Sequence, residues 1–474
     1  MKSSPDVVVI GAGPAGLACA STLVDHGVRP TVLEASPFVG GMARSTELWG
    51  HTVDLGPHRF FSSDPVVVAF WHKHVAGDHV MVRRTTRILY NGRLFDYPLK
   101  VGNALMNLGP VRAGAAVLSY LAARVRRPGP LDTLEAWITD RFGRVLFETF
   151  FKTYTEKLWG VRCTELDADW AAQRIQGLTL WGAIRGALLG NRGNALKTLV
   201  DEFAYPRSGN SLFYDRMRSH VEQGGGEIRT ESPVRRVVTD GGRVTGVTLA
   251  DGTTVEADHV VSSMPLTLLL KGLDDVPEHV TEAAARLRFR NTILVYLRVD
   301  GIDLFDDQWL YVHDEAVLHG RITNFRNWSP ELVANDDESV LCLEYWCFDE
   351  DAIWSEDDAT LVGRAREELV QTSLATDGAI VDGAVIRVPR CYPVYERGYQ
   401  QPLQTVTDWL DGIDGLTAIG RYGAFKYNNQ DHSLLMGIMA AEGLADGTPA
   451  PLWHVNTETT YQEAAPSSSL RSDG

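Results

Sequence analysis

The chain has 474 residues and a formal net charge of −16, which argues against nucleic-acid binding because that function depends on neutralising phosphates with Lys and Arg. Apolar residues at 44% and charged residues at 22% are typical of a soluble globular enzyme, and no run of about 18 apolar residues predicts a membrane-spanning helix. Five scattered cysteines, odd in number and without metal-ligand spacing, favour a reducing, cytoplasmic location over a disulfide framework.

The first predicted elements form a dinucleotide-binding turn. An apolar run at 7–10 predicts a buried parallel strand, and residues 17–24 predict a helix. Between them, Gly11 allows a tight turn, Gly13 lets the backbone approach a pyrophosphate, and Gly16 lets the helix pack close to the strand. The pyrophosphate would then lie on the unpaired N–H groups at the start of the helix.

A second strand supports this prediction. Residues 30–33 predict a strand that ends in Glu34, eighteen residues after Gly16, where an acidic side chain binds ribose hydroxyls. Ala15 lies inside the glycine turn, and we include it among the cofactor-binding residues. FAD and NAD share this pattern, so the turn alone predicts a dinucleotide without choosing between them.

The following region is mostly helical in pattern, with a short strand pair predicted around 87–97 and an amphipathic helix over 131–154. Residues 115–121 are mostly apolar and precede a basic segment that ends at Arg127. Such a helix either contacts an anionic membrane surface or has a solvated basic end. His72 and His74 point to different faces of a predicted helix, and we expect no metal site.

The residues after Glu34 indicate which dinucleotide is bound. The segment Gly40-Gly41-Met42-Ala-Arg44 resembles the glycine-pair element of the large FAD-dependent amine-oxidase group, the alternative being an ordinary strand-to-loop connection. This resemblance implies that Gly41 and Met42 lie at the FAD diphosphate, and that Arg44 lies near the diphosphate or the flavin. We therefore expect FAD.

Two later segments resemble the same group. Paired strands at 227–237 and 243–252 resemble the module that covers the adenine, with the Val234 backbone facing the base. Gly420 and Arg421 precede a predicted helix whose N-terminus, by resemblance, points at the flavin C2 carbonyl and stabilises negative charge on reduced flavin.

A polar cluster at 428–433 precedes that helix. Asp431 or Ser433 is predicted to cap the helix, and because the cluster should face the flavin pyrimidine ring, we also expect cofactor contacts from Asn429, Asp431 and Ser433. His432 is a candidate acid–base group.

Five blocks, in a shared order, resemble the UDP-galactopyranose mutase family across nearly the whole chain. The blocks are 56–61, 90–98, 154–160, 206–209 and 420–431. The chain is also similar to bacterial proteins described as protoporphyrinogen-oxidase-like, which share the fold without a settled reaction. In the mutase family, N5 of reduced FAD attacks the anomeric carbon of the sugar and displaces the nucleotide diphosphate, with no net redox change.

The mutase resemblance implies residue roles. Tyr427 would hydrogen-bond the sugar-nucleotide phosphates, Trp159 would line the sugar pocket, and Arg290 and Arg421 would lie beside flavin and diphosphate. The alternatives are core packing for Trp159 and Tyr427 and a surface position for Arg290. Our candidate catalytic residues are His58, Arg290, Tyr427, Asn429 and His432.

Three departures from the mutase pattern change the expected ligand. Phe61 replaces a histidine that stacks on the flavin, and it can pack but cannot titrate. Leu178 stands where a second phosphate-binding arginine is expected, although Arg174 is nearby. Asn429 replaces an aspartate beside the phosphate-binding tyrosine.

We predict an α/β fold with a discontinuous Rossmann-type FAD-binding domain, a helical cap and an antiparallel β substrate domain. The predicted ranges are 1–60, 195–270 and 405–455 for the FAD-binding domain, 61–194 for the cap, 271–404 for the substrate domain and 456–474 for a disordered tail.

Three functions remain open at this point. The first is a mutase-like FAD enzyme acting on a sugar derivative, with a possible external flavin reductant. The second is an oxidoreductase that transfers hydride, and the third is a non-catalytic flavin-binding protein. The aromatic residues that could line a substrate pocket are Trp159, Tyr392, Tyr395, Tyr399 and Tyr427, and we also assign Phe61, Arg174 and Arg290 to substrate binding.

Overall fold

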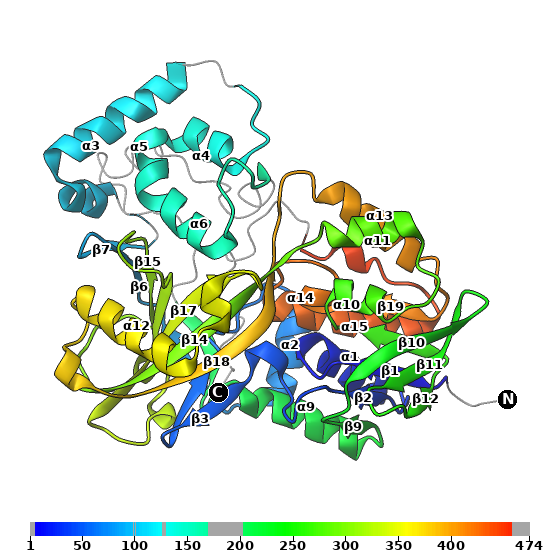
Figure 1. The fold of residues 1–474 in the computed structure, drawn as a ribbon. Coiled ribbons are helices and arrows are strands. Elements are labelled where there is room, and N and C mark those ends of the chain that lie inside the picture. Colours follow the sequence, from blue (N-terminus) through cyan, green and yellow to red (C-terminus); the bar gives the residue numbers. More distant parts are fainter. Residues whose placement is uncertain (1–4, 98, 100, 126–128, 169–201, 457–474) are drawn as a thin grey trace.

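The computed structural model describes residues 5–97, 99, 101–125, 129–168 and 202–456. Arg174, Leu178 and residues 457–474 of the expected tail lie outside the described residues. The fold is mixed α/β, with one parallel sheet, one large and mostly antiparallel sheet, and a separate group of helices (Figure 1).

A five-stranded parallel sheet contains the strand that precedes the predicted dinucleotide-binding turn. Its strands, in spatial order, are β19 (Leu416–Ala418), β13 (His259–Ser262), β1 (Val7–Ile10), β2 (Thr31–Leu33) and β9 (Glu227–Arg229). All four residues of β1 are buried, as expected for a parallel strand covered on both faces. Val7 and Val9 join one core cluster and Val8 and Ile10 join another, so each face of the sheet has its own apolar core.

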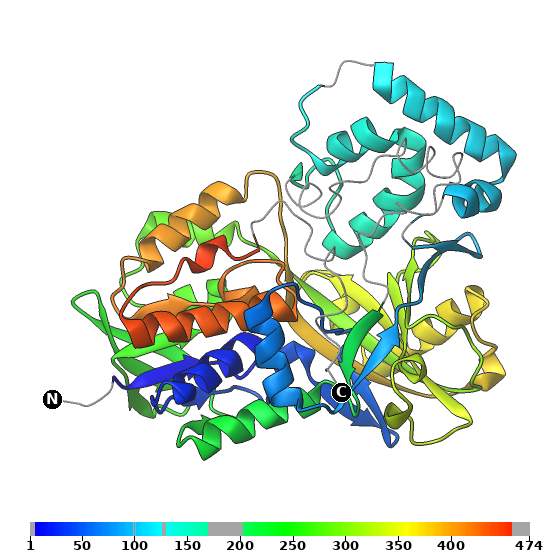
Figure 2. The same cartoon turned by 180° about the vertical axis from the view of Figure 1, so that it is seen from behind.

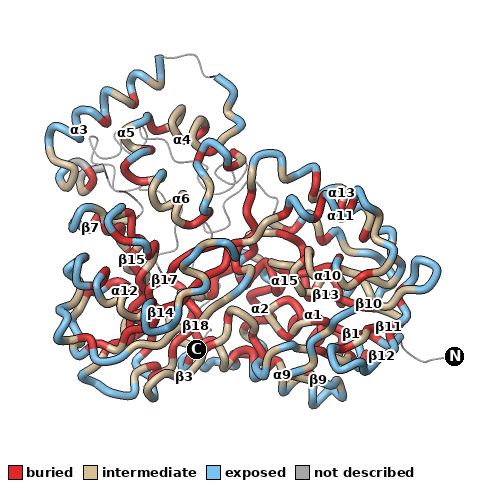
Figure 3. Tube along the Cα trace, in the orientation of Figure 1, coloured by how far each residue is buried: buried red, intermediate tan, exposed pale blue. Residues whose placement is uncertain are grey.

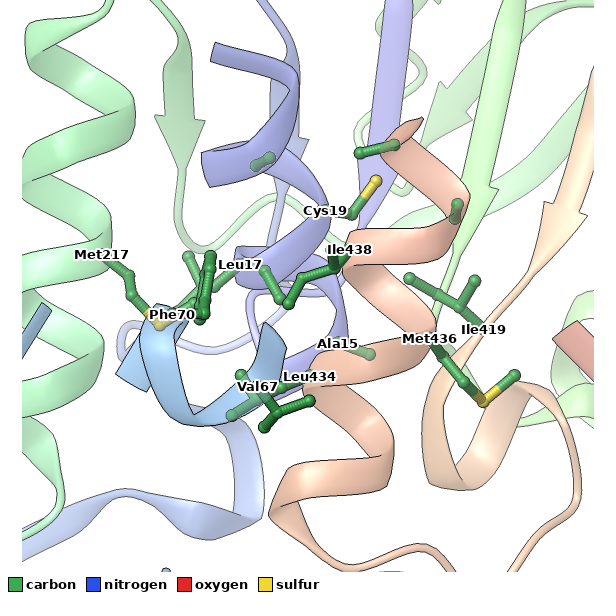
Figure 4. Close-up of a cluster of buried hydrophobic side chains, with 14 of the residues drawn as sticks. Ala15, Leu17, Cys19, Val67, Phe70, Met217, Ile419, Leu434, Met436 and Ile438 are labelled. Atoms are coloured by element: carbon green, nitrogen blue, oxygen red, sulfur yellow. The ribbon is translucent and has the colours of Figure 1, made fainter. Parts of the chain in front are cut away.

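Helices far apart in sequence cover one face of this sheet. They are α1 (Pro14–Asp25), α2 (Pro65–Val75), α9 (Ser211–Gln223) and α15 (Gln430–Asp446). Figure 2, seen from behind, shows α15 in orange-red lying against α1 in dark blue. A Cβ atom at Gly437 would lie 2.2 Å from the carbonyl oxygen of Ala15, so the two helices approach at backbone distance. Figure 4 shows the apolar side chains between them, including Ala15, Leu434 and Ile438.

The other face packs against a smaller sheet and short helices. These elements are β10 (Val234–Asp240), β11 (Arg243–Leu249), β12 (Thr254–Glu256), α10 (Leu266–Lys271), α11 (Glu278–Ala285) and α13 (Gln400–Leu410), while α14 (Gly420–Gly423) contacts α1, α10 and α15.

The large sheet has seven strands and one parallel pair, β15 with β6. Its strands, in spatial order, are β18 (Ile380–Pro393), β14 (Phe289–Asp300), β17 (Glu338–Cys347), β16 (Arg321–Asn324), β15 (Trp309–Val312), β6 (Thr86–Tyr90) and β7 (Arg93–Asp96). The strand pair expected around 87–97 is therefore β6 and β7, which extend this sheet. Helix α12 (Asp358–Gln371) packs against β14 and β18, and two-stranded sheets pair β3 (Ser45–Leu48) with β4 (His51–Asp54) and β5 (His79–Arg83) with β8 (Glu202–Pro206).

The helical cap forms the upper lobe of Figure 1 and contacts the large sheet, with α3 against β7 and α6 against β17. Its helices are α3 (Val101–Val125), α4 (Leu134–Phe142), α5 (Arg144–Phe147) and α6 (Thr153–Trp159), with a π-helical turn at Glu148–Lys152. The prediction of one helix over 131–154 is wrong. Gly143 breaks it with φ of +81°, and a Cβ there would lie 2.7 Å from the backbone nitrogen of Tyr120 in α3. The break at Gly143 thus lets α3 and α5 pack at backbone distance.

Candidate active site

In the glycine turn after β1, the fold requires glycine at two of the three positions, and the third glycine has a different explanation. Gly11 has φ of +93°, and a Cβ atom at Gly16 would lie 1.9 Å from the carbonyl oxygen of Gly11. The fold itself therefore requires glycine at both positions. Gly13 differs, because its φ is −78° and the nearest atom to an added Cβ is the Cα of Gly41 at 3.8 Å. Nothing among the described residues requires glycine at 13, which fits a position kept open for a diphosphate.

The carboxylate of Glu34 is fixed at the end of β2. It accepts hydrogen bonds from the backbone nitrogens of Ala12 and Ser36, each at 2.8 Å. An ionised carboxylate has about four acceptor positions, so capacity remains for ribose hydroxyls. Val234 lies at the first position of β10, where it pairs with Leu249.

The second glycine element lies directly against the first. Gly41 has φ of +55°, and an added Cβ would lie 3.1 Å from the Cα of Gly13. The half-buried Arg44 places its guanidinium 4.4 Å from the ring centroid of Phe38 and donates to the backbone oxygen of Ser45. The Met42 sulfur accepts hydrogen bonds from the Cys391 thiol at 2.9 Å and from the Tyr422 hydroxyl at 3.2 Å.

The C-terminal cofactor element meets the same turn from the other side. Gly420 has φ of +79°, and its added Cβ would lie 2.9 Å from the Cβ of Ala15 in α1. Strand β13 pairs in parallel with both β1 and β19. The turns that follow β1 and β19 therefore lie at the carboxyl-terminal end of the same sheet. The glycine turn and the polar turn before α15 therefore lie on the same side of the molecule, as the FAD prediction requires.

Asn429 caps α15, so the prediction of Asp431 or Ser433 as the cap is wrong. The side chain of Asn429 accepts from the backbone of His432, whose Nδ1 lies 3.3 Å from the Asn429 backbone nitrogen. This reciprocal arrangement is a capping box, in which the N-cap amide satisfies a free N–H group. Ser433 instead donates to the carbonyl oxygen of Asn429 at 3.0 Å, and Asp431 lies 3.2 Å from His432.

Two buried polar atoms at the start of α15 are available to hydrogen-bond a ligand. Gln430 Nε2 and His432 Nε2 have no hydrogen-bond partner among the described residues. Buried polar atoms normally have partners, and both belong to the first turn of α15. Together with the open position at Gly13, they show that the residues present suit a bound dinucleotide.

His58 lies in the loop that follows β4. Burial, followed by the charges of Arg321 and Arg421, lowers the pKa of His58 to about 3. The imidazole is therefore neutral near pH 7, and its Nδ1 has no partner among the described residues. It can hydrogen-bond a ligand without contributing charge.

Asp54 and Asn210 fix the His58 loop. Asn210 donates from Nδ2 to the backbone oxygen of His58 and to the Asp54 carboxylate, both at 2.7 Å. Asp54 also accepts from the hydroxyls of Ser45 at 2.6 Å and Tyr205 at 2.8 Å. Nothing in the sequence pattern pointed to this network, because Tyr205 lies more than 150 residues after Asp54, and Asn210 lies more than 150 residues after both Asp54 and His58.

An aromatic cluster lies around Arg421. The rings of Tyr392 and Tyr427 stack with centroids 5.5 Å apart, and the Arg421 guanidinium lies 4.3 Å from the Tyr427 centroid. Trp159 of α6 lies 5.6 Å from Tyr427 and stacks on Tyr395 at 6.1 Å. The hydroxyl of Tyr395 accepts from the backbone nitrogen of Tyr427 at 2.8 Å. Five of the predicted substrate or cofactor residues are thus brought together, namely Trp159, Tyr392, Tyr395, Arg421 and Tyr427.

Arg321 is a further charged group that the sequence analysis missed. It forms a two-point ion pair with Glu344 and lies 3.3 Å from the Tyr392 hydroxyl. Although burial opposes the charge, Glu344 raises the pKa of Arg321 well above its usual value. The pairing follows from the register of β16 on β17, which the sequence does not reveal.

Arg290 lies beside the aromatic cluster, opposite Tyr392 in the strand register, but its guanidinium is taken up by protein groups. It is 4% exposed and donates to the carbonyl oxygens of Leu158 at 3.3 Å and Lys157 at 3.1 Å, and to Asp351 at 3.1 Å. These contacts satisfy the C-terminal carbonyls of α6, next to Trp159. The geometry favours a positioning role for Arg290. Phe61 is 9% exposed and belongs to the apolar cluster around α1 and α15.

Among the described residues, no group of three His, Cys, Asp or Glu side chains could hold a metal ion. The five cysteines, all of them in the described part of the chain, are buried and unbridged.

The chain belongs to the family of flavin containing amine oxidoreductases, whose model matches residues 14–432. With this membership and the cradle described above, the protein is a flavoprotein that binds FAD.

Individual relatives differ in their activities. The chain is 28% identical to hydroxyneurosporene desaturase of Cereibacter sphaeroides over 308 residues, which cover 58% of this chain and 59% of the relative. It is 23% identical to a probable UDP-galactopyranose mutase of Klebsiella pneumoniae over 176 residues, covering 35% and 44%. The chain thus spans less than two thirds of these curated relatives.

Solved structures share the fold across almost the whole chain. The crystal structure of reduced UDP-galactopyranose mutase has a TM-score of 0.82 at 21% identity, covering 94% of this chain and 98% of that one. A putative protoporphyrinogen oxidase from Exiguobacterium sp. has a TM-score of 0.72 at 18% identity, covering 94% and 100%. These likenesses establish a fold that serves both kinds of flavoenzyme.

Proposed function

We propose that the protein is an FAD-dependent enzyme that acts through flavin N5 on a nucleotide-linked or related sugar, by pyranose–furanose isomerisation or a related flavin step. The observation that carries the proposal is the aromatic cluster of Trp159, Tyr392, Tyr395 and Tyr427 around the Arg421 cation. Binding sites for small molecules combine aromatic faces with a few placed polar groups. A sugar ring offers apolar C–H faces to the former and hydroxyls to the latter.

Arg421 can contribute a charged hydrogen bond to the substrate. Its Nε donates to the carbonyl oxygen of Cys391 at 3.0 Å and its Nη1 to that of Asn428 at 2.6 Å, while Nη2 has no partner among the described residues. Two anchors fix the guanidinium plane, which leaves one edge for an anionic or hydroxyl oxygen.

The first turn of α15, His58 and Tyr395 would each have a different role around the bound flavin. When bound, FAD supplies N5 as the reactive atom, as a nucleophile or as a hydride carrier. The first turn of α15 stabilises negative charge at the pyrimidine side through its N–H groups and dipole. Neutral His58 supplies a hydrogen bond, and Tyr395 holds the Tyr427 backbone so that the Tyr427 ring faces Arg421. We assign the cofactor contacts to these elements together with Glu34 and the two glycine turns.

The test uses the FAD-loaded protein reduced with dithionite under anaerobic conditions and offered a panel of nucleotide pyranoses. We expect furanose products, and we expect Tyr427→Phe to raise KM while the flavin absorption spectrum stays unchanged. Tyr90→Phe in β6 is the matched control, because the Tyr90 hydroxyl accepts from Arg112 and its ring contacts Phe95 and Phe150. Complete inactivity across the panel, with flavin fully loaded and reduced, would refute the sugar assignment.

An oxidoreductase is the second candidate, favoured by a specific observation. Glu344 pairs with Arg321, and Phe61 stands where the mutase family has a histidine, so two positions that could bind a diphosphate offer it no free polar group. Hydride transfer requires an apolar surface over flavin N5, and one relative of this chain is a hydroxyneurosporene desaturase. Anaerobic bleaching of oxidised flavin by a polyene or an amine, without turnover of any nucleotide sugar, would establish this alternative. A flavin that no reductant or substrate changes would indicate a binding protein.

A further inference from the structure

Helix α3 exposes large apolar side chains along one stripe. Val111 is 85% exposed, Leu118 is 69% and Val125 is 88%. These positions recur every seven residues, which places them on one side of an α-helix, and Leu121 is 50% exposed beside them. Figure 3 shows the outer side of α3 as largely exposed at the edge of the cap.

The opposite side of the helix fixes this orientation. Ala116 and Tyr120 are buried against the cap, and the Ser119 hydroxyl accepts from the backbone nitrogen of Val145 at 3.2 Å. Because a Cβ at Gly143 would clash with the backbone of Tyr120, α3 lies at contact distance from α5 along this side. Rotating the helix to bury the stripe would break these contacts, so the stripe stays outward in the folded protein.

The charge of this segment is opposite to that of the whole chain. Residues 97–131 contain Lys100 and four arginines and no acidic residue, in a chain of net charge −16. Arg112 and Arg124 are exposed next to the ends of the stripe. Each is anchored through one nitrogen, Arg112 to the Tyr90 hydroxyl at 2.9 Å and Arg124 to the Tyr120 hydroxyl at 3.2 Å, which keeps the remaining donors available.

We propose that α3 docks the enzyme on an anionic lipid surface, with the stripe of Val111, Leu118, Leu121 and Val125 inserted among the acyl chains and Arg112 and Arg124 at the headgroup phosphates. An apolar stripe flanked by basic residues suits the boundary between headgroups and acyl chains. A second copy of this helix is a poorer occupant, because it would bring two acid-free basic segments together. No helix in the described ranges is long and apolar enough to cross a bilayer, so the contact is peripheral.

The stripe is of a size that supports docking. From Val111 to Val125 the helix rises about 1.5 Å per residue, so the stripe is roughly 20 Å long. Each inserted leucine adds about tenfold to the partition coefficient, and each arginine at an anionic surface adds about fivefold.

The experiment measures co-flotation of the FAD-loaded protein with vesicles of phosphatidylglycerol or of phosphatidylcholine. We expect binding to the anionic vesicles that weakens in high salt, and weak binding to the neutral ones. Leu118→Gln with Leu121→Gln should lower the bound-to-free ratio at least about tenfold. Ile302→Gln with Val370→Gln, two apolar residues 42% and 37% exposed elsewhere, is the matched control and should bind as the unaltered protein does.

Each outcome decides the proposal. Flavin content and thermal unfolding of the variants verify that the fold is kept, since every substituted side chain is exposed. Failure of the unaltered protein to float with phosphatidylglycerol vesicles at low salt would overturn the proposal, as would equal binding by the double leucine variant. A dimer in solution that the leucine substitutions dissociate, without vesicle binding, would instead assign the stripe to self-association.

Discussion

Replacing Gly13 with alanine tests the cofactor cradle without disturbing the fold. The added Cβ would meet no described protein atom closer than 3.8 Å, and the backbone at φ of −78° accepts alanine. Gly13 is the N-cap of α1, so alanine there costs about 1 kcal/mol at most. If the space in front of Gly13 belongs to the FAD diphosphate, the methyl group overpacks it by about 1–3 kcal/mol. The affinity for FAD then falls roughly 5- to 150-fold.

The assay compares two measurements on apoprotein. Isothermal titration with FAD gives the dissociation constant, and urea unfolding followed by circular dichroism gives the free energy of unfolding. Gly363→Ala in α12, where an added Cβ meets nothing within 4 Å, is the control and should bind FAD normally. Gly16→Ala should lose about 3 kcal/mol of stability, because its Cβ would clash with Gly11. Wild-type FAD affinity in Gly13→Ala would refute the assignment of this turn to the cofactor.

Three further predictions concern the site and its support. Tyr395→Phe removes the acceptor of the Tyr427 backbone N–H at 2.8 Å, and steady-state kinetics should show a rise in KM of about fivefold, from about 1 kcal/mol, with bound flavin unchanged. Arg290→Met leaves the C-terminal carbonyls of α6 without donors, and urea unfolding should show a loss of about 3 kcal/mol; an unaltered midpoint would contradict the positioning role. Burial, followed by the charge of Lys157, lowers the pKa of His313 from 6.5 to about 3, so between these values the unfolded chain binds a proton that the folded protein does not, and stability falls as the pH falls. His313→Phe should flatten that part of the profile of unfolding free energy against pH, and an equally steep profile would be the contrary result.

Local patterns in the sequence were sufficient to predict the geometry of the cofactor-binding turn. Gly11 and Glu34 act within a strand–turn–helix–strand segment, so their spacing alone specifies their geometry. The prediction of a polar helix start near 431 was right in position but wrong in its cap, since Asn429, Asp431 and Ser433 are all good capping residues and only the backbone of the helix decides among them.

The residues whose positions could not be predicted are placed by contacts with segments that are distant in sequence. Arg290 resembles a mutase arginine, yet its partners come from α6 and β17, about 55 to 130 residues away in either direction, and only their packing places the guanidinium. Arg321 and Glu344 face each other through a strand register that depends on the whole sheet. Gly143 divides a helix that periodicity predicts as continuous, because its contact with α3 outweighs local propensity.

The order of strands in the parallel sheet has a consequence for biosynthesis. Its first strand lies between β2 and β13, and β13 in turn lies beside β19 near residue 416. Translation must therefore pass residue 446 before β19 and α15 can close around β1 and α1. Such non-local assembly is slow and leaves early segments exposed. Nascent chains released before α15 emerges should therefore fail to retain flavin, and chaperone demand should be greatest for the N-terminal half.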